Sequence, residues 1–271
     1  DRILLFELID DFEPGFTPRR GFYSRGATVM ILFAWLAVIG LLRSGRRGIA
    51  ALLYLGIGAL IVLKFRSGAA AMVWATGACV FASYVFAKER MRQALGLMLA
   101  AAVLVAPLWA AALPAPNALH ADQRALPSSW SHRIVIWQFA AERIFERPLL
   151  GWGLDASRSI PGGREAVPWQ MDPDPNDKGD RVSVVQLMPL HPHSIALQLW
   201  LELGILGAAA LACLAYLLAR RAGDDAGLAA LVFAGAAICQ VSYGAWQTWW
   251  LSTLFMVAAA ALPLARRREA P

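Results

Sequence analysis

Residues 194–219 read SIALQLWLELGILGAAALACLAYLLA, an apolar run in which Glu202 is the single charged residue. An α-helix needs about 20 predominantly apolar residues in succession to cross the hydrocarbon core of a bilayer. This run is long enough, so the stretch predicts a membrane-spanning helix. Its first residue follows a polar segment. One end of the span therefore lies beside side chains that could take part in a reaction.

Other stretches of the chain have the same character. The protein has 271 residues, of which 58% are hydrophobic, and a mean hydropathy of +0.51, a composition that belongs to membrane proteins. We predict an all-α polytopic membrane protein with about seven transmembrane helices in this fragment and a large outer loop that contains an amphipathic helix. The remaining spans are expected at residues 27–42, 48–63, 68–87, 93–113, 226–242 and 246–265.

The net charge of +6 comes mostly from arginines that stand beside apolar stretches, which favours membrane anchors over nucleic-acid binding. Basic residues follow alternate predicted spans, and the positive-inside rule makes that side cytoplasmic. They are Arg43, Arg46, Arg47, Lys88, Arg90, Arg92, Arg220, Arg221, Arg266, Arg267 and Arg268. The long segment 114–191 is therefore expected on the opposite, extracytoplasmic side.

This topology predicts the organisation of the chain. The segments are an outer N-terminal segment (1–26), a four-helix membrane segment (27–113), the outer loop (114–191), a three-helix membrane segment (192–265) and a cytoplasmic tail (266–271). All 3 cysteines lie in apolar runs, which argues against a disulfide framework or a cysteine metal site. No initiator methionine precedes Asp1, so we expect the chain to be the C-terminal part of a longer protein.

The outer loop begins with a predicted helix at 129–147. Apolar residues recur there at helical spacing, and Pro148, followed by Gly151 and Gly153, ends the pattern. Because its aromatic side chains share one face, we expect the helix to lie on the membrane surface with that face down. Residues 155–190 show no periodicity and are expected to form a loop.

A titratable side chain stands where this loop meets the 194–219 span. His193, in His191-Pro192-His193-Ser194, can accept a proton because an unperturbed imidazole has a pKa of about 6.5. We interpret it as a general base for a substrate presented at the membrane surface. The plainer alternative is an interfacial histidine hydrogen-bonded to water. His191 is the nearby competitor for the same role.

Two arginines are candidates for binding an anionic substrate. Arg66 lies in a tight outer turn, Lys64-Phe65-Arg66-Ser67, and Arg133 lies on the predicted surface helix four residues before Trp137. The planar guanidinium group offers paired donors that suit phosphate oxygens. The alternatives are a snorkelling membrane anchor for Arg66 and a water-exposed charge for Arg133.

Acidic residues suggest two further interpretations. Glu202 lies within a predicted span, where a carboxylate is costly, so it either orients a histidine, pairs with an arginine, or pairs inside the helix bundle. Residues 172–180 superficially resemble a calcium loop, but the glycine falls at position eight and Ser183 at position twelve, so a solvated acidic turn fits better. No metal site is predicted.

Three motifs resemble one known family of membrane enzymes. His193-Ser194 is followed after nine residues by Gly204 and, after two further residues, by Gly207. This spacing resembles the signature of the O-antigen ligase family and of its polymerase and protein-glycosylating relatives. Arg66-Ser67 in an outer turn is similar to the same family, as is Arg133-x3-Trp137 with the run Pro148-Leu149-x-Gly151-x-Gly153.

The resemblance implies a function and a place in the cell. The expected activity is inverting, metal-independent transfer of a glycan from undecaprenyl diphosphate to the lipid A–core oligosaccharide, on the periplasmic face of the bacterial inner membrane. His193 would be the catalytic base, and Arg66 and Arg133 would bind diphosphate, with His191, Glu202 and Trp137 in support. No cofactor is expected, and the partners are the lipid-linked donor, the lipid A–core acceptor and membrane lipids, not nucleic acid.

Alternatives remain open at this point. An O-antigen polymerase and a protein O-oligosaccharyltransferase share the motif and differ in the acceptor. A lipid or solute transporter is a different class, which would favour charged residues near the midplane of several spans and broken helices. The spans of this chain are nearly free of charge, which favours an enzyme.

Overall fold

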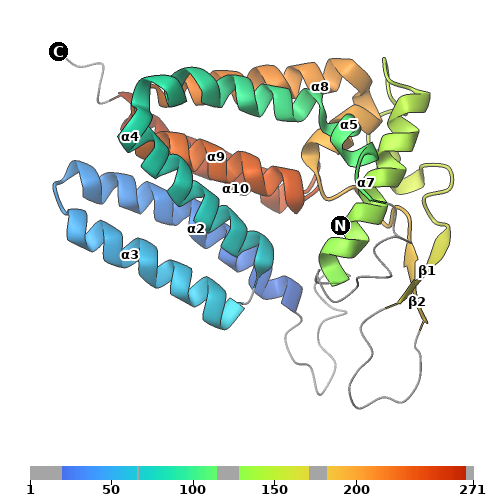
Figure 1. Ribbon diagram of the computed structural model, residues 1–271, viewed down its shortest axis with the longest axis horizontal. Coiled ribbons are helices and arrows are strands. Elements are labelled where there is room, and N and C mark those ends of the chain that lie inside the picture. Colours follow the sequence, from blue (N-terminus) through green and yellow to red (C-terminus); the bar gives the residue numbers. More distant parts are fainter. Residues whose placement is uncertain (1–19, 66, 115–127, 171–181, 267–271) are drawn as a thin grey trace. The chain divides into compact units, whose positions relative to one another are not determined.

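The computed structural model describes residues 20–65, 67–114, 128–170 and 182–266 (Figure 1). Within these ranges the chain is mostly helical, and 5 helices are long and apolar enough to cross a membrane. The chain is therefore an all-α polytopic membrane protein, as the sequence predicts. It divides into two compact units.

The first unit comprises Asp1–Arg92, Arg221–Ile238 and Ser252–Pro271. Its helices α2 and α3 lie side by side and are joined by a short turn (Figure 1). The elements represented in it are α2 (Arg20–Arg43), α3 (Arg47–Leu60), the π-helical turn η1 (Ile61–Phe65), the first part of α4 (Gly68–Leu104), and most of α9 (Ala226–Val241) and α10 (Thr248–Arg266).

The second unit comprises Gln93–Arg220 and Cys239–Leu251. It holds the end of α4, the short helix α5 and the long helices α7 and α8. The bounds of its elements are α5 (Ala106–Ala111), α7 (Ser128–Glu146), the 3-10 turn η2 (Ala156–Ser159), β1 (Ala166–Gln170), β2 (Val182–Gln186) and α8 (Ile195–Ala222).

The predicted spans coincide with helical segments, and the third and fourth are two helices that meet at a kink. They form most of the 37-residue helix α4, which is kinked at Ala87 (φ −139°, ψ 43°). The sequence predicts a loop here because basic residues stand between two apolar runs. Residues 88–92 are nevertheless helical, because they include no glycine or proline and favour helix, so the two helices meet at the kink without a loop between them. α9 has 16 residues and is shorter than the five candidate membrane spans, which have 18 or more.

Large apolar side chains remain exposed on the membrane helices. The exposed fractions are 73% for Leu63, 88% for Phe86 and 72% for Phe255. Contiguous exposed apolar surface is rare on soluble proteins. Such exposure is expected where a helix faces lipid.

Charged residues from several connections of the first unit meet at one end. Arg43, the last residue of α2, forms an ion pair with Asp225 at 2.6 Å and donates a hydrogen bond to the Leu264 carbonyl oxygen. Lys88 forms an ion pair with Asp224 at 3.0 Å. The end of α2, the kink of α4 and the start of α9 therefore lie together, as alternate connections of up-and-down spans require.

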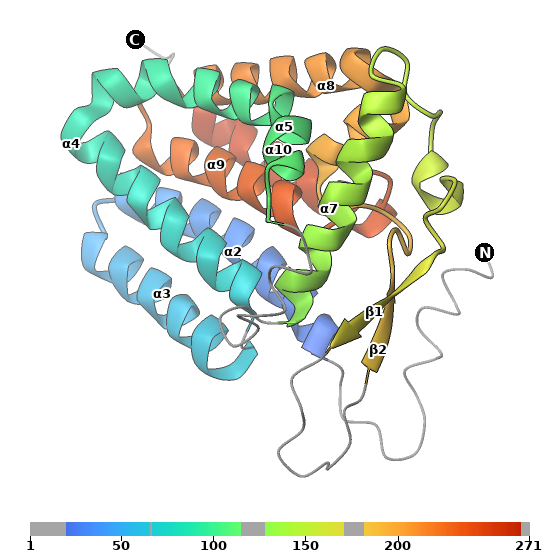
Figure 2. The same ribbon diagram turned by 45° about the vertical axis from the view of Figure 1, so that its right-hand side comes forward.

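Helix α7 packs inside the second unit, where α5 lies beside it (Figure 2). Ile136, Trp137, Ala140 and Ile144 on its apolar face belong to one buried cluster with residues of α5 and α8. The expectation that this face lies down on the membrane surface is therefore wrong. Neighbouring helices of the same unit cover it.

Part of the stretch 155–190 is a two-stranded antiparallel ladder. Ala166 of β1 lies opposite Gln186 of β2, and Gln170 lies opposite Val182. The prediction of a plain loop is wrong here because each strand has only 5 residues, too few for a clear alternation of polar and apolar positions. The ladder meets the start of α7, where His132 Nε2 lies 3.1 Å from the Gln186 carbonyl oxygen.

Candidate active site

The segment 191–194 leads into α8 and is held by α7. The Trp137 indole N–H donates to the Pro192 carbonyl oxygen at 2.8 Å. Ser194 caps α8, because its hydroxyl oxygen accepts the Leu197 N–H at 3.4 Å. His193 has a left-handed backbone, φ +52°, which residues other than glycine seldom adopt. The segment thus separates His193 from the regular helix that follows it.

The protonation pattern of His193 follows from its partner. Its Nδ1 lies 2.7 Å from the Ser242 carbonyl oxygen. A carbonyl oxygen only accepts, so Nδ1 carries the proton of the neutral ring and donates it to this bond. The lone pair is therefore on Nε2, which has no hydrogen-bond partner within the described part of the chain. A histidine in this state is prepared to accept a proton at Nε2.

His191 is engaged at both ring nitrogens. The His193 backbone N–H donates to His191 Nδ1 at 3.1 Å, so the proton of the neutral ring is on Nε2. The Gln247 side-chain amide lies 3.2 Å from that nitrogen, and it accepts the proton when its oxygen takes this position. His191 therefore supports the conformation of His193 and is a poor candidate for the base.

Burial and nearby positive charge keep both histidines neutral. Burial lowers the pKa of His193 to about 4, with a further lowering from Arg133 and an opposing contribution from the Ser242 hydrogen bond. Burial lowers the pKa of His191 to about 3, and the charges of His193, Arg158 and Arg133 act in the same direction. At neutral pH the site therefore holds uncharged imidazoles beside a cation.

Arg133 is that cation, and it projects from α7 as a half-buried side chain. Its guanidinium carbon lies 5.5 Å from the centre of the Trp130 ring, a cation–π contact. Burial lowers the pKa of Arg133, but an arginine remains protonated at any physiological pH. The structure places Arg133, Trp137 and both histidines in the second unit.

Two other arginines, near the end of α7, have local partners. Arg143 forms an ion pair with Glu146 at 2.6 Å. Arg147 lies over the Trp152 ring, 4.0 Å from its centre. Arg133 lowers the pKa of both His191 and His193, whereas Arg143 and Arg147 are not among the charges that act on these two histidines.

Helix α8 is broken at Gly204, and the segment after α7 fills the break. Gly204 has φ +63° and ψ −152°, a conformation open almost only to glycine. Three backbone hydrogen bonds join the two segments: Trp152 N–H to Leu201 O at 2.9 Å, Gly153 N–H to Glu202 O at 2.9 Å, and Ile205 N–H to Pro148 O at 2.8 Å. The motif spacing includes Gly204 but does not predict this break.

The two backbones touch at a pair of glycines. A Cβ atom on Gly204 would lie 2.3 Å from the Leu149 carbonyl oxygen, and one on Gly151 would lie 2.5 Å from the Glu202 backbone. No side chain fits at either position. The Pro148-Leu149-x-Gly151-x-Gly153 run and Gly204, the first glycine of the histidine motif, therefore form one structural element.

Glu202 is completely buried beside this break. Its carboxylate accepts hydrogen bonds from Ser157 Oγ at 2.5 Å, Gln198 Nε2 at 3.0 Å, the Asp155 N–H at 2.8 Å and Trp246 Nε1 at 2.6 Å. Of the alternatives left open by the sequence, these contacts match pairing inside the bundle, with neutral donors in place of an arginine.

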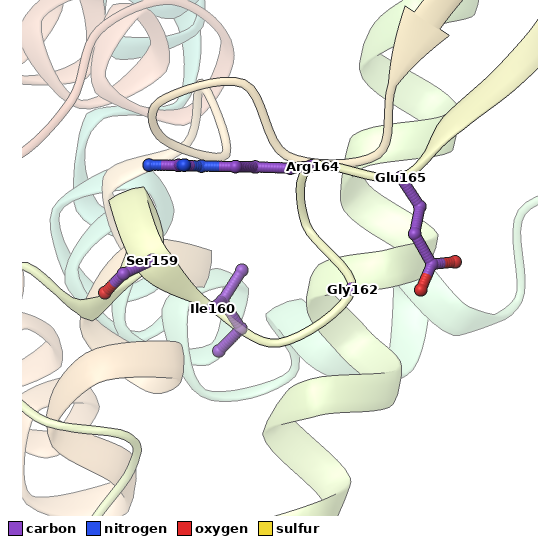
Figure 3. Close-up of a pocket in the computed structure, with 5 residues that line it drawn as sticks. All are labelled: Ser159, Ile160, Gly162, Arg164 and Glu165. Carbon is purple, nitrogen blue, oxygen red and sulfur yellow. The ribbon is translucent and has the colours of Figure 1, made fainter.

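Of two pockets in the second unit, one is lined by a predicted site residue and the other is not. A pocket of about 570 Å³ lies next to η2, where the Arg164 and Glu165 side chains point in different directions (Figure 3). None of the predicted site residues lines it. A cavity of about 10 Å³ is lined by His191 together with Asp155, Arg158, Leu190, Gln198, Gly244, Trp246 and Gln247.

Two predicted features lie outside the described residues: Arg66 and the acidic turn at 172–180. In the described ranges, no group of three or more histidine, cysteine, aspartate or glutamate side chains has the arrangement of a metal site. The segment 242–247, in contrast, contributes to the site and is missed by the sequence reasoning. Its signal is a short polar break, Ser-Tyr-Gly, between two apolar runs.

The fold and the site together define a multi-pass membrane protein whose polar centre lies beside the break in one long apolar helix. The family model described as O-antigen ligase matches residues 32–212. The chain belongs to this family.

Curated relatives agree with this assignment. Three Rickettsia proteins named as putative polysaccharide ligases are similar to the chain. The R. conorii protein is 30% identical over 237 residues (84% of this chain, 54% of the relative), the R. felis protein 29% over 268 (93% and 62%), and the R. prowazekii protein 30% over 266 (92% and 62%). The chain thus spans little more than half the length of these relatives. No solved structure matches it.

Proposed function

We propose that the protein is an inner-membrane glycosyltransferase that moves a glycan from undecaprenyl diphosphate to the lipid A–core oligosaccharide on the periplasmic face. Membership of the O-antigen ligase family supports the reaction class. The observation that carries the proposal is His193: Nδ1–H is held by the Ser242 carbonyl, Nε2 offers a lone pair, and the Arg133 charge lies close enough to lower its pKa.

The chemistry is a direct displacement at the anomeric carbon. The acceptor hydroxyl oxygen attacks this carbon while His193 Nε2 takes the hydroxyl proton. The bond from the anomeric carbon to the diphosphate oxygen breaks, and diphosphate leaves with the electron pair. Arg133 and Arg66 bind the diphosphate and stabilise its growing negative charge. Attack from the opposite side inverts the configuration.

The low basicity of His193 fits a base that depends on its substrate. Burial and Arg133 hold the pKa of the free imidazole at about 4. A bound diphosphate offsets the arginine charge and favours protonated imidazole, so its arrival raises the pKa of His193. Proton removal is thereby coupled to donor binding.

The test is transfer by the purified full-length protein, with lipid-linked glycan as donor and lipid A–core, growing glycan and protein as separate acceptors. We expect His193→Ala to abolish transfer, His191→Ala to reduce it less, and His132→Ala, on the neighbouring helix, to retain it. In the wild type, kcat/KM should stay level from pH 7 to about 5 and fall near pH 4, where the free base becomes protonated. Near-normal transfer by well-expressed His193→Ala would exclude His193 as the base.

A further inference from the structure

Glu202 is a buried charged group that the displacement reaction does not use directly. Its exposed fraction is 0%, and four donors satisfy its two oxygens. A buried carboxylate without such partners would be strongly destabilising. The segments that supply the donors are therefore fixed in place as long as Glu202 is present.

Two of these donors lead to the segment that holds His193. Trp246 Nε1 donates to Glu202 Oε2 at 2.6 Å. Gln198 Nε2 donates to Glu202 Oε1, while Gln198 Oε1 accepts the Ala245 N–H at 2.7 Å. Glu202 thus holds the turn 242–247 directly through one side chain and indirectly through one backbone group.

The same turn determines the state of the histidines. The Ser242 carbonyl oxygen accepts the proton of His193 Nδ1 at 2.7 Å. Gly244 lies against the His191 ring, where an added Cβ atom would be 2.9 Å from His191 Cγ. A displacement of the turn would therefore alter both the hydrogen bond of His193 and the packing of His191.

We propose that Glu202 is a positioning residue: it fixes the turn 242–247, and through Ser242 it determines which nitrogen of His193 carries the proton and leaves Nε2 bare. This inference rests on the proposed role of His193 as the base. Glu202 itself touches neither substrate nor reacting atoms. It acts through Trp246, Gln198 and the turn.

The decisive variant is Trp246→Phe, which keeps an aromatic ring but removes one donor to Glu202. Trp246 is 36% exposed, so the fold tolerates this change better than a change at Glu202. The matched control is Trp152→Phe, which removes an indole hydrogen bond of similar length, 2.8 Å to the Arg143 carbonyl oxygen, in the same unit. The acceptor of this bond, Arg143, lies outside the turn 242–247.

The expected readout is the pH dependence of kcat in the full-length protein, with folded protein matched by thermal melting. The groups that face the two histidines are His132 and Arg133 on α7 and Arg158 on η2, and all variants leave them in place. Trp246→Phe should lower the kcat plateau about 10-fold to 100-fold, the range for a hydrogen bond to a charged group. It should also move the acid limb to lower pH, because the Ser242 bond raises the pKa of His193.

Trp152→Phe should change neither the plateau nor the limb. Loss of the plateau in Trp246→Phe without a shift of the limb would show that Glu202 is only structural. Equal effects of the two variants, or no effect of Trp246→Phe, would also overturn the proposal. His193→Ala is measured first: if it retains transfer, the proposed function fails, whereas if only the tryptophan test fails, the positioning role alone is lost.

Discussion

Replacement of Gly204 by alanine tests whether the break in α8 is needed. The backbone at this position has φ +63° and ψ −152°, and an added Cβ atom would lie 2.3 Å from the Leu149 carbonyl oxygen and 2.7 Å from the Leu150 nitrogen. Both neighbours are backbone atoms that cannot turn away. The segment 148–153 must therefore move, or α8 must close into a regular helix.

The expected loss of folding free energy follows from the interactions that either movement would remove. A non-glycine residue in this region of φ and ψ costs about 1–3 kcal/mol. Each of the three backbone hydrogen bonds that cross the break contributes about 0.5–1.5 kcal/mol. The combined loss is roughly 3–7 kcal/mol, a large part of the 5–15 kcal/mol that stabilises an ordinary domain.

The assay is thermal unfolding of the detergent-purified full-length protein, followed by transfer activity per folded molecule. We expect Gly204→Ala to lower Tm by many degrees and to abolish transfer, because Glu202 and the 242–247 turn lose their fixed positions. The control is Gly235→Ala in α9, where an added Cβ meets nothing within 4 Å, so Tm should stay the same or rise slightly. Wild-type Tm and activity in Gly204→Ala would refute the role given to the break.

Three further predictions concern the substrate, the metal requirement and the topology. Arg133→Lys and Arg66→Lys should each slow transfer about 10-fold to 100-fold, because lysine lacks the planar fork of donors. Arg143→Lys, the control, should leave the rate of transfer nearly unchanged. Wild-type rates in both Arg133→Lys and Arg66→Lys would show that these arginines serve only as membrane anchors. Transfer should persist in excess EDTA, and activity restored only by magnesium or calcium would point to a metal site. Cysteines placed at Ser67 and Ser131 should react with an impermeant thiol reagent in spheroplasts while one at Ser44 should not, and the inverse pattern would overturn the predicted orientation.

The spans could be predicted from the sequence because lipid imposes a simple requirement. A long apolar run has few ways to satisfy its backbone groups in a bilayer other than as a helix, so hydropathy alone indicates α2, α8 and α10. Hydropathy does not indicate whether two neighbouring apolar runs are joined by a loop or by a kink. Between residues 88 and 92 the charged side chains suggest a loop, yet these residues are helical, and the two helices of α4 meet directly at the kink at Ala87.

The site could be predicted only in part because its contacts cross large separations in sequence. Motif spacing indicates His193 and Arg133, and both lie in one unit. It cannot indicate Ser242, which is 49 residues from His193, or Trp246, which is 44 residues from Glu202. Glu202 is detectable as a charge within a span, but its partners are neutral donors, which carry no signature in a single sequence.

The spacing of the histidine motif follows from the geometry of α8 before its break. Ser194, Gln198 and Glu202 are four residues apart, so their side chains share one face of the helix. Ser194 caps the helix, Gln198 and Glu202 hold the turn that binds His193, and Gly204 opens the break. One inserted residue would rotate the later positions by about 100° and carry Glu202 away from Trp246 and Ser157. The fixed interval between His193 and Gly204 is therefore a requirement for one carboxylate to reach all of its donors, and it does not depend on which acceptor the enzyme uses.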